Sequence, residues 1–293
     1  MSDSTVEENL SADVDPSDVE DAESDDSTVE EDAKHTPSGV PLRVENLRKS
    51  FGGIDAIDGA SFGVEKGSLT GLIGPNGAGK STTFDCITGA TAPTAGAVYF
   101  ENEEITGLPP HEVAERGVVR TFQIARQLDE MTVLENVMLA PGGQTGESLA
   151  WAVTPGLRSR VKSEERATRE DAWETLELFE LDHLAGEYAG NLSGGQRKLL
   201  ELARALMTDP QMLLLDEPFA GVNPSLEVEI LDRIHDLREE GYTFLLVEHD
   251  IDLIMEHCEH IVVLHQGKVL AEGDAEAIQG DERVVEAYLG GEV

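Results

Sequence analysis

This sequence is poor in cysteine, in basic residues and in long apolar segments, and each shortage excludes a class of protein. Its 293 residues include 2 Cys, and 21 Lys and Arg stand against 59 Asp and Glu, which gives a formal net charge of −38. So acidic a chain lacks the basic face that a phosphate backbone requires, and we therefore expect no nucleic-acid partner. No stretch approaches the roughly 18 consecutive apolar residues of a membrane-spanning helix.

The two cysteines, Cys86 and Cys258, lie far apart, each in a stretch with apolar periodicity. This spacing is typical of two separate core thiols in a reducing compartment rather than of a disulfide framework. The N-terminal residues also lack the basic and apolar regions of a secretion signal. We therefore expect an intracellular protein with two free thiols.

Residues 1–38 differ sharply in composition from the rest of the chain. Acidic residues dominate this segment, Ser and Thr lie between them, and Lys34 is its only Lys or Arg. Because it has almost no large apolar side chains, the segment cannot bury enough surface to offset the entropy of ordering. We expect a disordered acidic tail, either a solubilising segment or an interaction surface.

Residues 39–292 have the pattern of a globular domain. Residues 42–52 and 59–74 are predicted to form short strands separated by glycine turns, and residues 97–105 another strand with alternating faces. These strands predict an antiparallel β layer at the start of the domain.

The second half of the domain has a different pattern. Residues 211–218 and 243–250 are continuous apolar runs that end in acidic residues, as buried parallel strands do. Residues 260–273 have the glycine turn of a hairpin, and residues 125–190 are mostly helical in pattern. The alternation of strands and helices predicts an α/β core.

The segment "GPNGAGKS", residues 74–81, fits the pattern G-x-x-x-x-G-K-[ST] between an apolar strand and a helix that Gly89 closes. In this pattern the glycines let successive backbone N–H groups face a phosphate, the lysine reaches the β- and γ-phosphate oxygens, and the hydroxyl binds Mg²⁺. The predicted nucleotide-binding residues of this loop are Gly74, Pro75, Asn76, Gly77, Ala78, Gly79, Lys80, Ser81 and Thr82.

The segment "MLLLDEP" contains the second half of a nucleotide site. Its four apolar residues predict a buried strand, and Asp216 at the end of the strand is predicted to approach Mg²⁺ directly or through water. Glu217 is placed to polarise the attacking water. An acidic pair at a strand end is otherwise a polar terminus, but a phosphate loop in the same chain favours the catalytic interpretation.

With these two motifs the sequence resembles the ATP-binding subunits of ABC transporters over residues 42–292. The remaining motifs of that family occur in the family's order. They are Gln123 in "RTFQ", the signature "LSGGQ" at residues 192–196, "AGVNP" at residues 220–224 and His249 in "VEHD". Phe51 matches the position where the family stacks an aromatic ring on adenine, although a buried aromatic residue at a strand end is the alternative.

The resemblance implies an ABC-type P-loop NTPase cassette with a RecA-like core, an antiparallel β layer and a helical subdomain at about residues 125–200. It implies ATP and Mg²⁺ as cofactors, catalytic roles for Glu217, His249 and Lys80, and Ser81, Gln123 and Asp216 as metal ligands. In the family two such subunits pack head to tail, so that the signature of one closes over the ATP held by the other. The signature residues that then contact nucleotide are Ser193, Gly194, Gly195 and Gln196.

Several stretches resemble one branch of that family, the ATPases of branched-chain amino-acid importers, among them "KSFGGIDAIDGASF" and "MTVLENVMLA". That branch implies a second ATPase subunit as partner, either a sister ATPase in a heterodimer or another copy in a homodimer. It also implies two integral membrane permease subunits, a separate solute-binding protein and a position at the cytoplasmic face of the membrane. Two positions differ from many relatives. Arg197 follows the signature where many relatives have a second glutamine, and Asn223 stands where many ABC proteins have aspartate. Neither difference removes a phosphate ligand. A soluble, non-transport ABC ATPase is the alternative.

Overall fold

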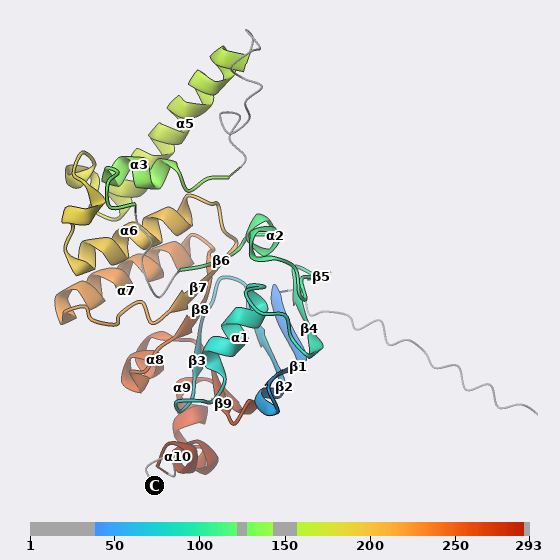
Figure 1. Cartoon of the computed structure of the whole chain (residues 1–293). Coiled ribbons are helices and arrows are strands. Elements are labelled where there is room, and N and C mark those ends of the chain that lie inside the picture. The colour runs from blue at the N-terminus through green and yellow to red at the C-terminus, as the bar shows by residue number, and fades with distance from the viewer. Residues whose placement is uncertain (1–38, 122–127, 143–156, 290–293) are drawn as a thin grey trace, which may run out of the picture. The chain divides into compact units, whose positions relative to one another are not determined.

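The computed structural model describes residues 39–121, 128–142 and 157–289 (Figure 1). All of these residues belong to one unit, Thr36–Val293. The predicted acidic tail and Gln123 therefore lie outside the described residues. Within the described ranges, none of the helices combines the length and apolar character that a bilayer-spanning segment needs.

The first part of the domain is an antiparallel sheet, as the sequence predicts. Its strands in the described residues are β1 (Leu42–Phe51), β2 (Ile54–Val64), β4 (Ala95–Phe100) and β5 (Glu103–Glu104), in the order β2-β1-β4-β5. Glycine turns separate β1, β2 and β3, as expected, with Gly52, Gly53 and Gly67 at positive φ.

A second sheet carries the segments that end in functional motifs. Its described strands, in spatial order, are β10 (Lys268–Gly273), β9 (His260–His265), β3 (Leu69–Ile73), β8 (Thr243–Val247), β7 (Met212–Asp216) and β6 (Val118–Arg120). All neighbouring strands are parallel except β10 and β9, which form the predicted hairpin. The parallel core is therefore confirmed, and parallel order brings the carboxyl ends of β3, β7 and β8 to one edge.

The described helices are α1 (Lys80–Ile87), α2 (Pro110–Glu115), α3 (Val133–Met138), α5 (Leu157–Leu178), α6 (Gly194–Leu206), α7 (Pro224–Glu239), α8 (Ile251–His257), α9 (Ala275–Gln279) and α10 (Glu282–Leu289), with 3-10 turns at Asp182–Leu184 and Ala189–Asn191. They cover both faces of the second sheet, so that two apolar cores form. One core lies between this sheet and α3 and α5 to α10. The other joins it to α1, α2 and the antiparallel sheet.

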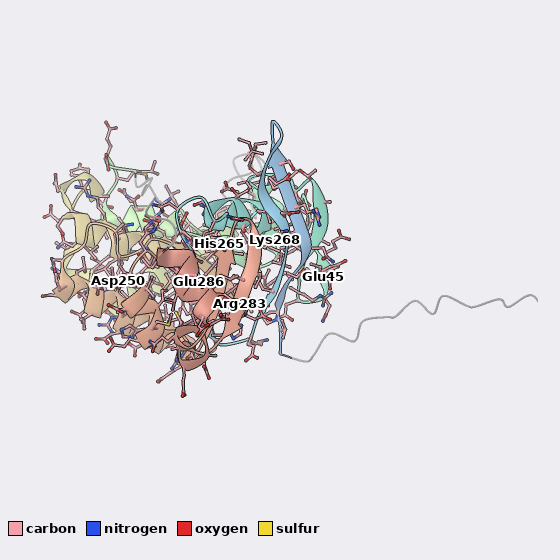
Figure 2. The ribbon with its side chains drawn as sticks, turned by 90° about the horizontal axis from the view of Figure 1, so that it is seen from below. Glu45, Asp250, His265, Lys268, Arg283 and Glu286 are labelled. Carbon is pink, nitrogen blue, oxygen red and sulfur yellow. The ribbon has the colours of Figure 1, made fainter. Side chains whose placement is uncertain are left out.

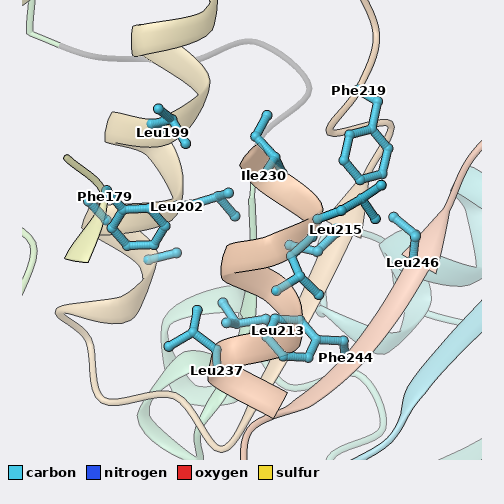
Figure 3. Packing of buried hydrophobic residues seen from close by; sticks show 14 of the residues in the cluster. Phe179, Leu199, Leu202, Leu213, Leu215, Phe219, Ile230, Leu237, Phe244 and Leu246 are labelled. Carbon is cyan, nitrogen blue, oxygen red and sulfur yellow. The ribbon is translucent and has the colours of Figure 1, made fainter. Parts of the chain in front are cut away.

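Burial of both faces explains why β7 and β8 are continuously apolar. Side chains alternate across a strand, so Leu213 and Leu215 enter the first core (Figure 3) while Leu214 enters the second. Cys86 and Cys258 fall in different cores as unpaired buried thiols, which confirms the expectation of two separate core residues. Burial raises their pKa values to about 11 for Cys86 and about 12 for Cys258.

The single strand predicted at residues 97–105 is wrong, because the structure divides this segment into a hairpin. Glu101 and Asn102 have φ of 47° and 68° and form the turn between β4 and β5. Positive φ at both central residues gives the twist that two-residue hairpin turns require. The buried Ile105 makes the whole segment resemble one strand, but the four consecutive polar residues "ENEE" between Phe100 and Ile105 mark the turn in the sequence.

Gly89, which ends α1, provides a stability test with a matched control. Its φ is +73° and an added Cβ would lie 2.0 Å from the carbonyl oxygen of Leu108, whereas Gly107 has a φ of +68° with nothing within 4 Å. Both Gly→Ala changes carry the left-handed penalty of roughly 1–2 kcal/mol. Gly89→Ala must also move backbone, which adds about 1–3 kcal/mol. Urea unfolding should therefore show the larger loss for Gly89→Ala, and equal midpoints would contradict the packing assignment.

Candidate nucleotide and catalytic site

The loop of residues 74–81 leaves the carboxyl end of β3 and is closely packed at its first residue. Gly74 has a φ of +152°, and a Cβ there would lie 2.1 Å from the carbonyl oxygen of Leu264 on β9. At the other end of the loop, Gly79 is the N-cap of α1, and a Cβ would lie 2.5 Å from the carbonyl oxygen of Ala56 on β2. Glycine is therefore required at both ends because the backbone of neighbouring strands approaches closely.

Lys80 is held inside this loop. Its Nζ donates to the carbonyl oxygens of Gly74 at 2.6 Å and Pro75 at 3.3 Å, and the residue is 7% exposed. Burial lowers the pKa of Lys80, while the nearby carboxylates of Glu217 and Asp216 oppose this by favouring the cation. The ammonium is thus poised at the loop with two backbone oxygens as its present partners.

The loop fits a phosphate group. Gly77 has a φ of +81° and open space where a side chain would lie, and the loop precedes the N-terminus of α1, where unpaired N–H groups favour an anion. The exposed Ser81 on the first turn places a hydroxyl beside it. Residues 75–78 also line a cavity of about 540 Å³ together with His265, Arg283 and Glu286 from the C-terminal elements (Figure 2).

Two acidic residues and a histidine meet at the carboxyl ends of β7 and β8. Asp216 ends β7 and is 3% exposed, and Glu217 follows it with a φ of 50°. Nε2 of His249, just after β8, lies 2.7 Å from Oε1 of Glu217. The structure thus brings together the residues predicted to polarise water and to contact the γ-phosphate, although 32 positions separate them in the sequence.

Sequence reasoning did not identify Arg120 and Asp85. Nη2 of Arg120 donates to Oδ2 of Asp216 at 2.5 Å, and Nη1 donates to Oδ1 of Asp85 on α1 at 2.6 Å. Burial by itself lowers the pKa of Arg120, but the hydrogen bonds to the two carboxylates outweigh it and raise the pKa. The signal in the sequence is a single charge at the end of the apolar run "GVVR", three residues before Gln123.

The signature begins α6, and this helix entry is the one the sequence predicts. Ser193 Oγ accepts from the N–H of Gln196 at 3.3 Å, and Gln196 Oε1 accepts from the N–H of Ser193 at 2.9 Å. In this capping box the Gln196 side chain is bound to the backbone of its own chain. The N–H groups of Gly194 and Gly195 come at the start of the helix, where backbone N–H groups have no intrahelical acceptor.

The signature lines a second cavity, of about 550 Å³, together with residues 221–223. Asn223 caps α7, because its Oδ1 accepts from the N–H of Leu226 at 3.1 Å. Asparagine in place of aspartate therefore still provides a capping oxygen at this position. The two cavities share no lining residue. Within the described residues, the loop residues 75–78 and the signature therefore line different cavities.

Phe51 ends β1 with an exposed ring. The side chain is 51% exposed, and Nζ of Lys49 lies 4.8 Å from the ring centroid. The alternative of a buried core aromatic residue is therefore excluded, and one face of the ring is free to stack. Among the predicted site residues, Gln123 alone lies outside the described part of the chain.

The comparisons with known proteins agree with this geometry. A family profile described as "ABC transporter" matches residues 57–220. A second profile, described as "Branched-chain amino acid ATP-binding cassette transporter", matches residues 268–293.

Curated relatives cover most of the chain. It is 47% identical over 249 residues to the probable branched-chain amino acid transport ATP-binding protein LivG of Archaeoglobus fulgidus, which spans 85% of this chain and 95% of that protein. It is 43% identical over 252 residues to the high-affinity branched-chain amino acid transport ATP-binding protein BraF of Pseudomonas aeruginosa, with coverage of 85% and 97%.

Solved structures show the same fold. The ADP conformation of an ATP-binding cassette of an ABC transporter matches with a TM-score of 0.73 and 42% identity, over 86% of this chain and 99% of that one. A bacterial ABC transporter cassette, solved as a dimer, matches with a TM-score of 0.65 and 28% identity, over 80% and 98% of the two chains.

Proposed function

This chain belongs to the ATP-binding subunits of ABC transporters and hydrolyses ATP, and we propose that it supplies the energy for an importer of branched-chain amino acids. The main support for the catalytic activity is the 2.7 Å contact between His249 and Glu217. It lies at the edge of the sheet where β7 ends in Asp216 and where the loop after β3 leads to Lys80 at the start of α1. The C-terminal profile and the relatives' names support the solute class.

In the proposed reaction, backbone N–H groups of the loop and Lys80 hold the phosphates of ATP, and the exposed ring of Phe51 stacks on adenine. Ser81, Asp216 and Gln123 are the proposed ligands of Mg²⁺, which neutralises charge on the β- and γ-phosphates when bound. Glu217 orients and polarises the attacking water, and His249 contacts the γ-phosphate while its Nε2 faces Glu217. Arg120 leaves Oδ1 of Asp216 available, since it binds Oδ2.

We further propose that each reaction centre is completed by a second ATPase subunit. Residues 193–196 line a cavity that is separate from the phosphate loop, so they are suited to a nucleotide held by another chain. Dimerisation then depends on bound ATP, because a ligand shared by two chains stabilises only the assembled state. The related cassette solved as a dimer supports this arrangement, and a sister ATPase is the proposed partner.

The remaining partners follow from membership of a transporter family. We propose two integral membrane permease subunits, a separate solute-binding protein and a position at the cytoplasmic face of the membrane. The transported solute is chosen by those other components. A soluble, non-transport ABC ATPase is the competing function, and its turnover would not depend on permeases.

The decisive experiment measures ATP hydrolysis by the complex of this chain, its sister ATPase and the two permeases in liposomes. Leucine together with the solute-binding protein should raise the turnover several-fold, whereas either one alone should not. Arginine, whose side chain is charged and unbranched, is the control solute. Equal turnover with and without solute and permeases would favour the soluble ATPase.

A further inference from the structure

Glu248 is a buried carboxylate that precedes His249 and has no role in the reaction described above. It is 7% exposed, and both of its oxygens are occupied by backbone donors. Oε1 accepts from the N–H of Phe219 at 2.9 Å, and Oε2 accepts from the N–H of His249 at 3.1 Å. One side chain thus joins the segment after β7 to the segment after β8.

The two segments that Glu248 joins carry Glu217 and His249. Glu217 itself is tied to β8, because its N–H donates to the carbonyl oxygen of Val247 at 2.9 Å. Phe219 is fixed on the other side, since its ring is buried beside Leu215 and Leu246 in the core (Figure 3). Two sets of hydrogen bonds therefore hold the segments of Glu217 and His249 together. One is the backbone bond from Glu217 to Val247, and the other is the pair of bonds that Glu248 accepts from Phe219 and His249.

We propose that Glu248 is a positioning residue that fixes the spacing between Glu217 and His249. This inference rests on the catalytic roles proposed for those two residues. Each carboxylate oxygen of Glu248 accepts from a backbone amide, and the residue is 7% exposed, so its contacts are with the backbone rather than with solvent. Hydrogen bonds from backbone N–H groups to a carboxylate are of the strong, charge-assisted kind, so they can hold the two segments at a fixed spacing.

Burial of the Glu248 carboxylate is unfavourable by itself, and the hydrogen bonds from two backbone N–H groups offset part of this cost. Burial raises the pKa of Glu248, because the charged form loses water, and the N–H groups of Phe219 and His249 oppose that rise. A buried acceptor that must satisfy two amides has little freedom to move. Replacement of one oxygen should therefore disturb geometry rather than charge alone.

Glu248→Gln tests the inference with almost no change of size. The amide has one oxygen, so either Phe219 or His249 loses its acceptor and faces an NH₂ group instead. Because a misplacement of about 1 Å at a reaction centre can lower the rate about 100-fold, we expect kcat to fall roughly 10- to 100-fold. ATP affinity should stay within about twofold of wild type, because the loop around Lys80 is not touched.

Glu259→Gln is the matched control. Glu259 lies just before β9. Its Oε2 accepts from the N–H of Leu69 at 2.8 Å and its Oε1 pairs with Arg238, so it is also a carboxylate that joins separate elements, but it binds at the start of β3, away from the catalytic edge. If Glu248 stabilises the fold only, both variants should lower the unfolding temperature and leave kcat unchanged. A selective loss of kcat in Glu248→Gln supports positioning.

A double-mutant cycle with His249→Ala separates positioning from an independent catalytic role. If Glu248 acts through His249, the double variant should be as slow as His249→Ala alone. Losses that multiply, or a wild-type kcat in Glu248→Gln, would overturn the proposal. Glu217→Gln and His249→Ala are assayed alongside, since normal turnover in both would instead refute the catalytic roles on which the proposal rests.

Discussion

Glu217→Gln is expected to bind ATP normally and to lose almost all turnover. The amide keeps the shape of the side chain and can still bond to Nε2 of His249, which lies 2.7 Å from Oε1, but it cannot polarise water as a base. Positioned bases of this kind contribute about 10²- to 10⁴-fold, and we expect kcat to fall by that factor. Steady-state phosphate release by the assembled ATPase pair measures it.

The same variant should accumulate a closed dimer in the presence of ATP. Two chains held by uncleaved nucleotide cannot separate through hydrolysis, so size measurements should show the dimer persisting as long as ATP is present. Glu239→Gln makes the same chemical change at an exposed position of α7 and serves as the control. Wild-type turnover in Glu217→Gln would disprove the assigned role.

Lys80→Ala is expected to abolish tight nucleotide binding. Lys80 is 7% exposed and is held by the carbonyl oxygens of Gly74 and Pro75, so its ammonium is already fixed at the loop before nucleotide arrives. A hydrogen bond to a charged group is worth about 1.5–3 kcal/mol, which corresponds to a rise in Kd of roughly 10- to 100-fold. Titration with a fluorescent ATP analogue measures the Kd.

The control for this variant separates loss of a phosphate contact from loss of fold. Lys66→Ala removes an exposed lysine whose ammonium lies 3.7 Å from Glu101, and it should leave Kd unchanged. The unfolding temperature of Lys80→Ala without nucleotide shows whether the loop remains folded. An unchanged Kd in a folded Lys80→Ala protein would contradict the phosphate cradle.

Local sequence was sufficient for the parts of this protein that depend on neighbouring residues. The loop of residues 74–81, the helix entry at Ser193 and the buried strands before Asp216 and His249 were all predicted and are all present. In each case the reason is local, namely glycine conformations, a capping box within four residues and continuous apolar runs. The turn at Glu101 and Asn102 was missed because the apolar residues on either side of it, Phe100 and Ile105, were assigned to one strand.

Contacts between distant residues were decided by tertiary structure alone. Arg120 binds Asp216 across 96 positions and Asp85 across 35, and Glu248 binds the amide of Phe219 across 29. No periodicity in a single sequence specifies such pairs, because the parallel order of β6, β7 and β8 and the packing of α1 on the sheet set them. The sequence by itself determined which chemical groups this ATPase carries. Only the packing of adjacent parallel strands decided which groups meet, since strand order fixes the neighbours at the edge of the sheet.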